Sequence, residues 1–401
     1  MKRPMLFAIL ISLLFFSCGN SSSIILWSDK PELADAVELY NMNGSEYRVI
    51  FQYKEDLVSS FFKEETKPDI IIGEDLSNST VKNELIDLNE ALKSGTGFAD
   101  LLTTPLISGT ERGEEYPLVP LSYSPLTIVY RKNSKRIEGN SIFLNINEIL
   151  DLGIQFNEEK KRGYSPYWDE NFLLAFLDLN GTSFREGKEN LLEWNREALE
   201  SSTDFLGDWQ IRNGGLESMD AFNSKYLYDN RIKLLKEGRI LFSAYNLGDY
   251  MALSDSMIRI LDFSYVSYGE KMHPGVVVYG GINKKNRSLE QSALFMNWLL
   301  EKGNQELIIS SAIRNGTGSF GFLGGLSSFD DVNRGIITAY YPVLEGKIPF
   351  SSYLHSEPEK PVEYKKVQNE LITRWLRDER KGSAETLDVA FDKWRKLRIP
   401  F

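Results

Sequence analysis

The sequence predicts an α/β protein of two lobes, and three observations lead to this prediction. Segments typical of strands alternate with segments typical of helices from residue 24 onward. Two strand-like segments, 116–121 and 126–131, are separated only by the short stretch 122–125, after which a new helical series begins. Another buried strand follows that series at 276–279. A chain of 401 residues is long enough for two such domains.

The N-terminus has the features of an export signal. Two basic residues precede an almost unbroken apolar run, Met5–Phe16, whose 12 residues fall short of the roughly 20 needed by a membrane-spanning helix. Cys18, the only cysteine, follows directly. We therefore expect a signal peptide over 1–17, lipid attachment to Cys18 and a flexible tether over 18–23. A buried free thiol is the alternative for a lone cysteine.

The charge balance excludes nucleic acid as a partner. Without the two basic residues of the signal, 44 basic side chains stand against 57 acidic ones, which is a net charge of −13. Nucleic acid and anionic lipid surfaces would repel such a chain. Because no later apolar run approaches membrane-spanning length, we expect a soluble domain that is held at the membrane only by its lipid.

The first lobe is predicted to begin as a series of βαβ units. Strands are expected at 24–27, 47–53 and 69–73, and helices at 32–40, 57–63 and 81–92. The sequence Asp-Ile-Ile-Ile-Gly at 69–73 is typical of a parallel strand that is buried on both faces. Such units wind into a parallel sheet with helices on both faces.

Helical patterns dominate the rest of the chain. Helices are predicted at 146–152, 170–179, 188–201, 221–237, 288–300, 362–377 and 384–397, with strands at 239–245 and 258–266. The strand at 276–279 ends in Gly280-Gly281-Ile282, and the five glycines of 315–325 predict a loop or a crossing between lobes.

These segments, in this order, resemble a known family. The resemblance rests on the first strand with Trp27 at its end, on Lys67–Gly73, Tyr116–Leu121, Ile128–Arg131 and Leu234–Ile240, and on Gly280–Asn283 before a helix with Ala293, Phe295 and Trp298. Behind a lipoprotein signal, they are similar to the family 1 extracellular solute-binding proteins of bacterial ABC importers, a group that includes the maltose-binding type.

The resemblance implies a periplasmic-binding-protein fold of type II, with discontinuous lobes joined by hinge strands. It places the N-terminal lobe at 24–127 plus 272–318 and the C-terminal lobe at 128–271 plus 319–401. The ligand would lie in the cleft between the lobes, and a hinge closure would present the protein to a membrane permease. The implied protein is a monomer without a cofactor that delivers a small polar solute, with a sugar or oligosaccharide favoured, on the extracytoplasmic side.

A sugar site needs aromatic platforms together with amide and carboxylate partners. Of the seven tryptophans, Trp27, Trp168 and Trp209 lie at element ends or in loops and are candidates for binding, whereas the other four lie in helical patterns. Packing explains Trp27 and Trp168 equally well. Trp168 ends the aromatic cluster Tyr164–Trp168 just before a helix, and we predict that it stacks on a sugar ring.

Polar candidates follow the carboxyl ends of predicted strands. Glu74 and Asp75 come directly after 69–73, where they would bind hydroxyls or cations, although Asp75 could instead cap the next turn. The remaining candidates are Ser122 and Tyr123 at the crossing, Tyr245 and Asn246 at a second-lobe strand end, and Gly280 and Gly281, which a tight turn explains as well.

Motifs for catalysis or metal binding are not found in the sequence. The two histidines, His273 and His355, are far apart and outside any metal-ligand spacing, so both are expected to be surface or loop residues. Neither a nucleophile elbow nor a P-loop occurs. We therefore predict no enzyme and no metal. Two alternatives stay open: the same fold binding a polyamine or other cation, and a surface lipoprotein whose decayed cleft serves as an interaction module.

Overall fold

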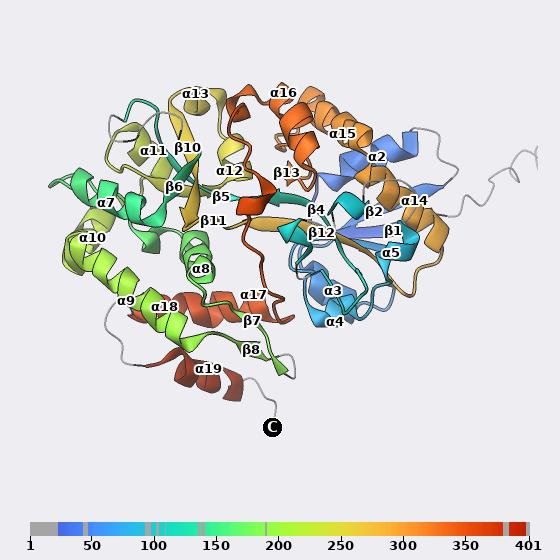
Figure 1. The fold of residues 1–401 in the computed structure, drawn as a ribbon, viewed down its shortest axis with the longest axis horizontal. Coiled ribbons are helices and arrows are strands. Elements are labelled where there is room, and N and C mark those ends of the chain that lie inside the picture. Colours follow the sequence, from blue (N-terminus) through green and yellow to red (C-terminus); the bar gives the residue numbers. More distant parts are fainter. Residues whose placement is uncertain are drawn as a thin grey trace, which may run out of the picture.

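The structure is a computed structural model that describes residues 23–42, 47–92, 98–101, 104–108, 110–134, 137, 141–188, 191–379 and 385–397. The predicted signal and Cys18 lie outside the described residues. Figure 1 shows two sheets beside each other, each with its own helices, and chain segments that pass from one to the other. The predicted two-lobed α/β architecture is therefore confirmed.

Lobe 1 is built on a six-stranded sheet with the order β13-β4-β12-β3-β1-β2. Its strands are β1 (Ser23–Ser28), β2 (Arg48–Tyr53), β3 (Ile70–Gly73), β4 (Val119–Ser124), β12 (Val276–Ile282) and β13 (Leu326–Ser327). Strand β1 pairs in parallel with β2 and β3, while β12 and β13 run antiparallel to their neighbours. The three isoleucines of β3 are fully buried, as their uninterrupted apolar run predicts.

Helices cover this sheet. They are α2 (Leu33–Met42), α3 (Leu57–Lys63), α4 (Ser79–Lys82), α5 (Leu88–Ala91), α6 (Phe98–Leu101), α14 (Leu289–Leu300), α15 (Lys302–Asn315) and α16 (Thr338–Tyr340), with a π-helical segment at Val332–Ile337. Asp69 joins three parts of the lobe, because its buried carboxylate accepts hydrogen bonds from the backbone N–H groups of Ile25 and Arg287 and from the Arg287 guanidinium. The parallel pairing of β1 with β3 places the carboxyl ends of the two strands side by side.

Lobe 2 is built on a five-stranded sheet. Its strands are β5 (Leu126–Arg131), β6 (Phe143–Asn145), β9 (Ser243–Asn246), β10 (Leu261–Tyr268) and β11 (Lys271–Met272), and a separate hairpin is formed by β7 (Arg185–Glu186) and β8 (Leu192–Glu193). Its helices are α7 (Ile146–Phe156), α8 (Glu170–Leu179), α9 (Arg196–Arg212), α10 (Gly215–Lys225), α11 (Arg231–Lys236), α12 (Leu247–Met251) and α13 (Asp255–Ile258).

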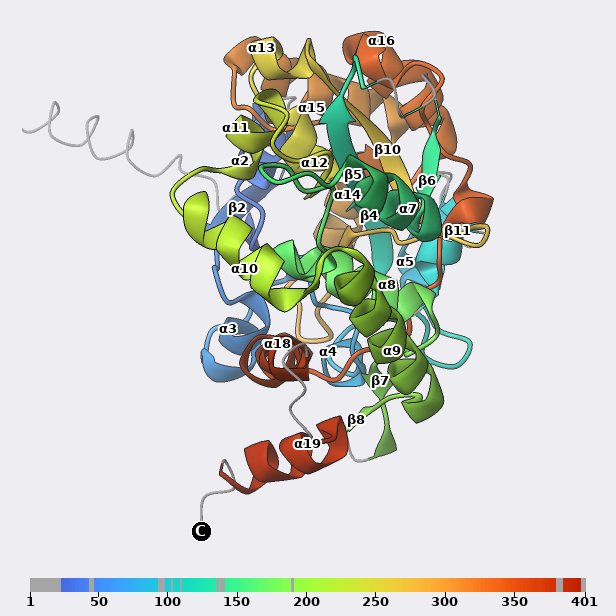
Figure 2. The ribbon, with the colours of Figure 1, turned by 90° about the vertical axis from the view of Figure 1, so that its left-hand side faces the viewer.

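The C-terminal helices α17 (Tyr364–Val367), α18 (Thr373–Glu379) and α19 (Leu387–Lys396) pack on lobe 2 near the β7–β8 hairpin (Figures 1 and 2). A π-helical segment, Gln368–Ile372, joins α17 to α18. No helix among the described residues is both long and apolar enough to cross a membrane.

Three segments connect the lobes, and their positions correct the predicted boundaries. The first crossing is at Pro125, since β4 belongs to one sheet and β5 to the other. The second is 273–275, between β11 and β12. The third lies beyond 341 rather than at 318, because β13 still pairs with β4 in lobe 1, whereas Lys347 bonds to Asp262 in lobe 2.

Several predicted elements also differ from the structure. The helix predicted at 188–201 is instead the end of the β7–β8 hairpin followed by α9, which runs on to Arg212. The helix predicted at 221–237 is divided into α10 and α11, since Asn230 caps a new helix by accepting a hydrogen bond from the backbone N–H of Lys233. Helix α15 was not predicted.

Candidate functional site

A recess lies between the two lobes, close to the first two crossings. It consists of two pockets of about 270 and 320 Å³, which share the lining residues Glu74, Asn246 and Val276. Both lobes contribute to each pocket, since Glu74 follows β3 of lobe 1 and Asn246 ends β9 of lobe 2. A ligand bound here would therefore contact both lobes at once.

The lobe 1 wall is formed by polar residues at the carboxyl ends of β1 and β3. Glu74 forms an ion pair with Lys30, and its backbone N–H donates to the Asp29 carboxylate. Burial and the charge of Glu74 raise the pKa of Asp29 to about 7. The wall therefore holds more carboxylate charge than its lysine can neutralise.

Asp75 has an unusual backbone conformation. Its φ of 56° is positive, which non-glycine residues rarely adopt outside turns and functional sites. Its carboxylate lies 2.9 Å from Lys365 Nζ of α17. The capping alternative does not apply, because the side chain of Asn78 caps α4 by accepting from the backbone N–H of Val81. Asp75 is thus free of a capping role and lines the recess.

On lobe 2, the predicted strand end at Tyr245 and Asn246 is present. Asn246 lines both pockets, while Tyr245 is half-buried and packs on the core. Asp249 of α12 lies beside Asn246 and also lines the recess. Burial raises the pKa of Asp249. From lobe 1, the charge of Lys30 lowers this pKa and the charge of Glu74 raises it. Asp249 was not predicted from the sequence, although its place one turn after a strand end was a signal.

Of the two residues predicted at the crossing, Ser122 lies at the recess and the side chain of Tyr123 lies in the core. Ser122 and Ser124 line one pocket, and the Ser124 hydroxyl accepts a hydrogen bond from the backbone N–H of Gly248 at 2.8 Å. Tyr123 borders the same pocket, but its side chain is only 2% exposed and lies in the core of lobe 1. Because side chains alternate along a strand, Tyr123 points away from the face that carries Ser122.

Four other predicted binding residues are buried in the core instead. Trp209 lies inside α9 rather than in a loop and packs edge-on against Tyr164 and Phe172. Trp27 is 1% exposed, and its Nε1 donates to Gln52 Oε1 at 2.8 Å. Gly280 and Gly281 lie in β12 and have no room for a side chain. A Cβ atom on Gly280 would lie 2.8 Å from Met296 Cε, so these glycines serve packing within the sheet.

Trp168 lies on the second-lobe side, in a 3₁₀ turn just before α8, but its ring already has partners. It stacks on Phe222, the Arg231 guanidinium lies 4.2 Å from its ring centre, and its Nε1 donates to Asn223 at 3.0 Å. It does not line either pocket of the recess. The structure thus places Trp168 in a packed aromatic cluster.

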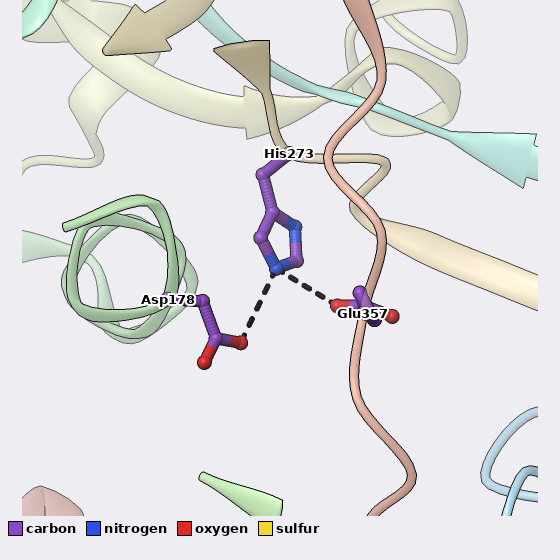
Figure 3. Close-up of side chains that lie close together, drawn as sticks. All are labelled: Asp178, His273 and Glu357. Atoms are coloured by element: carbon purple, nitrogen blue, oxygen red, sulfur yellow. Dashed lines mark ion pairs between the residues drawn. The ribbon is translucent and has the colours of Figure 1, made fainter. Parts of the chain in front are cut away.

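A partly buried charged cluster adjoins the crossings, and no pattern in the sequence predicted it. It consists of Asp178 of α8, His273 of the second crossing, and Glu357 and Lys360 of the third. Figure 3 shows the first three of these side chains. His273 Nε2 lies 2.8 Å from Glu357 Oε1 and 3.6 Å from Asp178 Oδ2, and Lys360 Nζ lies 3.0 Å from Asp178. His273 lies in a loop, which is one of the two expected placements, but it is not a surface residue, because it is only 8% exposed.

The charges in this cluster support one another. Burial alone would raise the pKa of Asp178, but Lys360 and His273 outweigh it and hold that pKa well below its usual range. Burial likewise opposes the protonation of His273, yet Glu357 and Asp178 raise its pKa to about 9. Two crossings and α8 are therefore joined by a network of ion pairs in which each charge has a partner.

Asp178, His273 and Glu357 are close enough to hold a metal ion, but the chemistry of His273 does not fit one. The backbone N–H of Gly275 donates to His273 Nδ1 at 3.0 Å, so in the neutral ring the proton is on Nε2. In the charged ring both nitrogens are protonated, and Nδ1 can no longer accept the hydrogen bond from Gly275. In either state Nε2, which faces the carboxylates, lacks the lone pair that a metal requires. The positive charge beside Asp178 comes from Lys360 instead.

The fold, but not the sequence, has counterparts among known proteins. No known family profile matches the sequence, and neither does any curated protein. Among solved structures, the chain is similar to the cyclic α-maltosyl-1,6-maltose binding protein of Arthrobacter globiformis, with a TM-score of 0.65 and 16% identity over 92% of this chain and 96% of that one. An ABC substrate-binding protein of Listeria monocytogenes in complex with cycloalternan is similar at a TM-score of 0.65, 15% identity and coverages of 92% and 96%.

A third similar structure is the ribitol-bound ABC solute-binding protein of Agrobacterium radiobacter, with a TM-score of 0.60, 15% identity and coverages of 94% and 98%. All three neighbours are binding proteins, and the second and third are binding proteins of ABC transporters. At such identities the likeness shows the fold, and the predicted periplasmic-binding-protein fold of type II is confirmed.

Proposed function

We propose that this chain is a lipid-anchored solute-binding protein that captures a sugar or short oligosaccharide between its lobes and delivers it to an ABC permease. The observation that carries the proposal is the recess lined by polar side chains of both lobes, in a fold whose similar structures bind sugars and a polyol. We further propose attachment through Cys18, a monomeric state on the extracytoplasmic side, and no enzymatic turnover.

Thermal-shift screening of the soluble chain 21–401 tests the proposal. The panel would contain maltose, maltotriose, ribitol and tagatose. A ligand present at 100 times its dissociation constant should stabilise the protein by about 2.7 kcal/mol. Asn246→Ala should weaken binding about 10-fold by removing a polar contact from both pockets, whereas Asn147→Ala, exposed on α7, should not. If no sugar or polyol produces a shift, this proposal fails.

A second candidate ligand, an organic cation such as a polyamine, is favoured by the charges of the larger pocket. Its charged lining residues are three carboxylates, Glu32, Glu74 and Asp249, and one ammonium, Lys30. One carboxylate oxygen of Glu32 is buried without a hydrogen-bond partner. The excess negative charge would attract a ligand that carries an ammonium group.

Proton release distinguishes the two candidates. A bound ammonium group would lower the pKa of Asp29 from about 7, so calorimetric titration with spermidine at pH 7 should release a fraction of a proton. The heat should therefore vary with the ionisation enthalpy of the buffer, and Asp29→Asn should remove that variation. Binding of a neutral sugar should release a smaller fraction of a proton. If spermidine gives no heat while a sugar binds, the cation candidate is excluded.

A further inference from the structure

Direct hydrogen bonds join the two lobes beside the recess, where α4 of lobe 1 faces the β7–β8 hairpin of lobe 2. The backbone N–H of Ser79 donates to Glu186 Oε2 at 3.1 Å, and the Ser79 hydroxyl donates to the other oxygen of the same carboxylate. The two residues are 107 positions apart in the chain, and both are half-buried. Hydrogen bonds to an ionised, partly shielded carboxylate are the stronger kind.

The third crossing passes through the same point and is bonded to both lobes. The backbone N–H of Glu186 donates to the carbonyl oxygen of Glu359 at 2.6 Å. The Glu359 carboxylate lies 2.9 Å from Lys82 Nζ in lobe 1. The backbone N–H of Lys360 donates to the carbonyl oxygen of Ser77 at 3.3 Å. In Figure 1 this crossing descends between the lobes toward α17, with α4 and β7 on its two sides.

The lobe 1 half of this contact is held rigidly. Lys82 is only 2% exposed, and its ammonium group also donates to the carbonyl oxygen of Glu111 at 2.7 Å. Asn78 caps α4. The Ser79 amide is one of the first N–H groups of α4, which have no acceptor within their own helix, so Glu186 of the other lobe supplies one. The position of Ser79 within lobe 1 therefore does not depend on lobe 2.

We propose that Glu186 and Ser79 form an interlobe latch, which holds the lobes together before any ligand is bound. No covalent connection forces these residues into contact, so a hinge rotation that separates α4 from β7 must break both hydrogen bonds. The latch then supplies part of the free energy of closure, and a ligand has to supply less. This inference goes beyond the proposed function, because it holds for any ligand.

Interlobe distances in the ligand-free protein test the latch. The soluble chain 21–401 contains no cysteine, so Glu38→Cys on α2 and Ser224→Cys on α10 provide two exposed labelling sites in different lobes. Pulsed electron–electron double resonance between spin labels on these two cysteines should give a single narrow distance distribution. Glu186→Ala should broaden it and move its mean by several ångströms, and Ser79→Ala should act in the same direction but less, because the backbone N–H remains.

A matched control is available in the same hairpin. Glu193 carries the same charge, is exposed and faces Arg185 rather than lobe 1, so Glu193→Ala should leave the distribution unchanged. If Glu186→Ala does not fold by circular dichroism, Glu186→Gln keeps the shape and should give a smaller change. An unchanged distribution in the folded Glu186 variant would show that the contact is a pivot and would overturn the latch. A wild-type distribution as broad as that of the variant would overturn it as well.

Discussion

At the scale of single residues, the surroundings of Trp168 decide between packing and ligand stacking. The ring contacts Phe222 and Arg231, and its N–H is bonded to Asn223. We therefore expect Trp168→Ala to lower the free energy of unfolding by about 3 kcal/mol, since it removes a large packed ring. Urea denaturation measures this loss. Affinity for any sugar found in the screen should change less than 3-fold, and an affinity loss without a stability loss would restore the stacking prediction.

The buried carboxylate of Asp69 leads to a prediction about how the stability of the protein depends on pH. Burial opposes its ionisation, but the Arg287 guanidinium and two backbone N–H groups outweigh burial and lower its pKa. A depressed pKa in the folded state contributes stability above the unfolded pKa of about 3.9, and this contribution is lost as the pH falls through the folded value. Asp69→Asn should therefore cost about 3 kcal/mol at pH 7 and should flatten the acid limb of the stability curve below pH 4.

Denaturation midpoints between pH 2 and 7 measure both effects. Asp388→Asn is the control, because Asp388 and its partner Arg196 are both exposed and such pairs contribute less than about 1 kcal/mol. If Asp69→Asn and Asp388→Asn lose the same small amount, the anchoring role of Asp69 is refuted.

At the scale of elements, the second crossing is shaped by one glycine. Gly275 has a φ of 70°, and a Cβ atom there would lie 1.9 Å from the carbonyl oxygen of Ser124, on the first crossing. Gly269, in the turn between β10 and β11, has a similar φ of 58° but open space around it. We therefore expect Gly269→Ala to cost about 1 kcal/mol from backbone strain alone, and Gly275→Ala to cost at least 3 kcal/mol because two crossings must move apart.

Chemical denaturation of the two variants measures the difference. Equal losses would mean that the close approach of the two crossings is not required for stability. The comparison is matched, since both substitutions add one methyl group at a positive φ on either side of β11.

At the scale of the whole molecule, a single residue is expected to control attachment to the membrane. The proposed anchor is the lipid on Cys18, which follows the apolar run of the predicted signal. Cys18→Ser should abolish labelling by radioactive palmitate and release the protein into the soluble fraction, because an acyl anchor supplies the membrane affinity. Retention of the unlabelled variant in the membrane fraction would contradict the anchor.

Local sequence patterns predicted much of the architecture correctly. The apolar run of β3, the strand at 126–131 and the helices at 57–63 and 170–179 have the predicted bounds or nearly so, because their periodicity is strong and turn residues flank them. The order of the segments was sufficient to predict the fold class. Helix α15 was missed because its apolar residues do not form a clear stripe, and the hairpin near 188 was missed because its strands are two residues long.

The sequence by itself predicted the strand ends that place Glu74, Asp75 and Asn246 at the recess, whereas Ser122 lines the recess from inside β4 rather than from a strand end. It could not determine exposure. Trp27, Tyr123 and Trp209 are buried by neighbours from other parts of the chain. Only the tertiary structure brought His273 to Asp178 and Glu186 to Ser79, because these pairs depend on how two lobes and three crossings meet. The physical reason is that periodicity reports one face of one element, whereas a site is formed where faces of several elements converge.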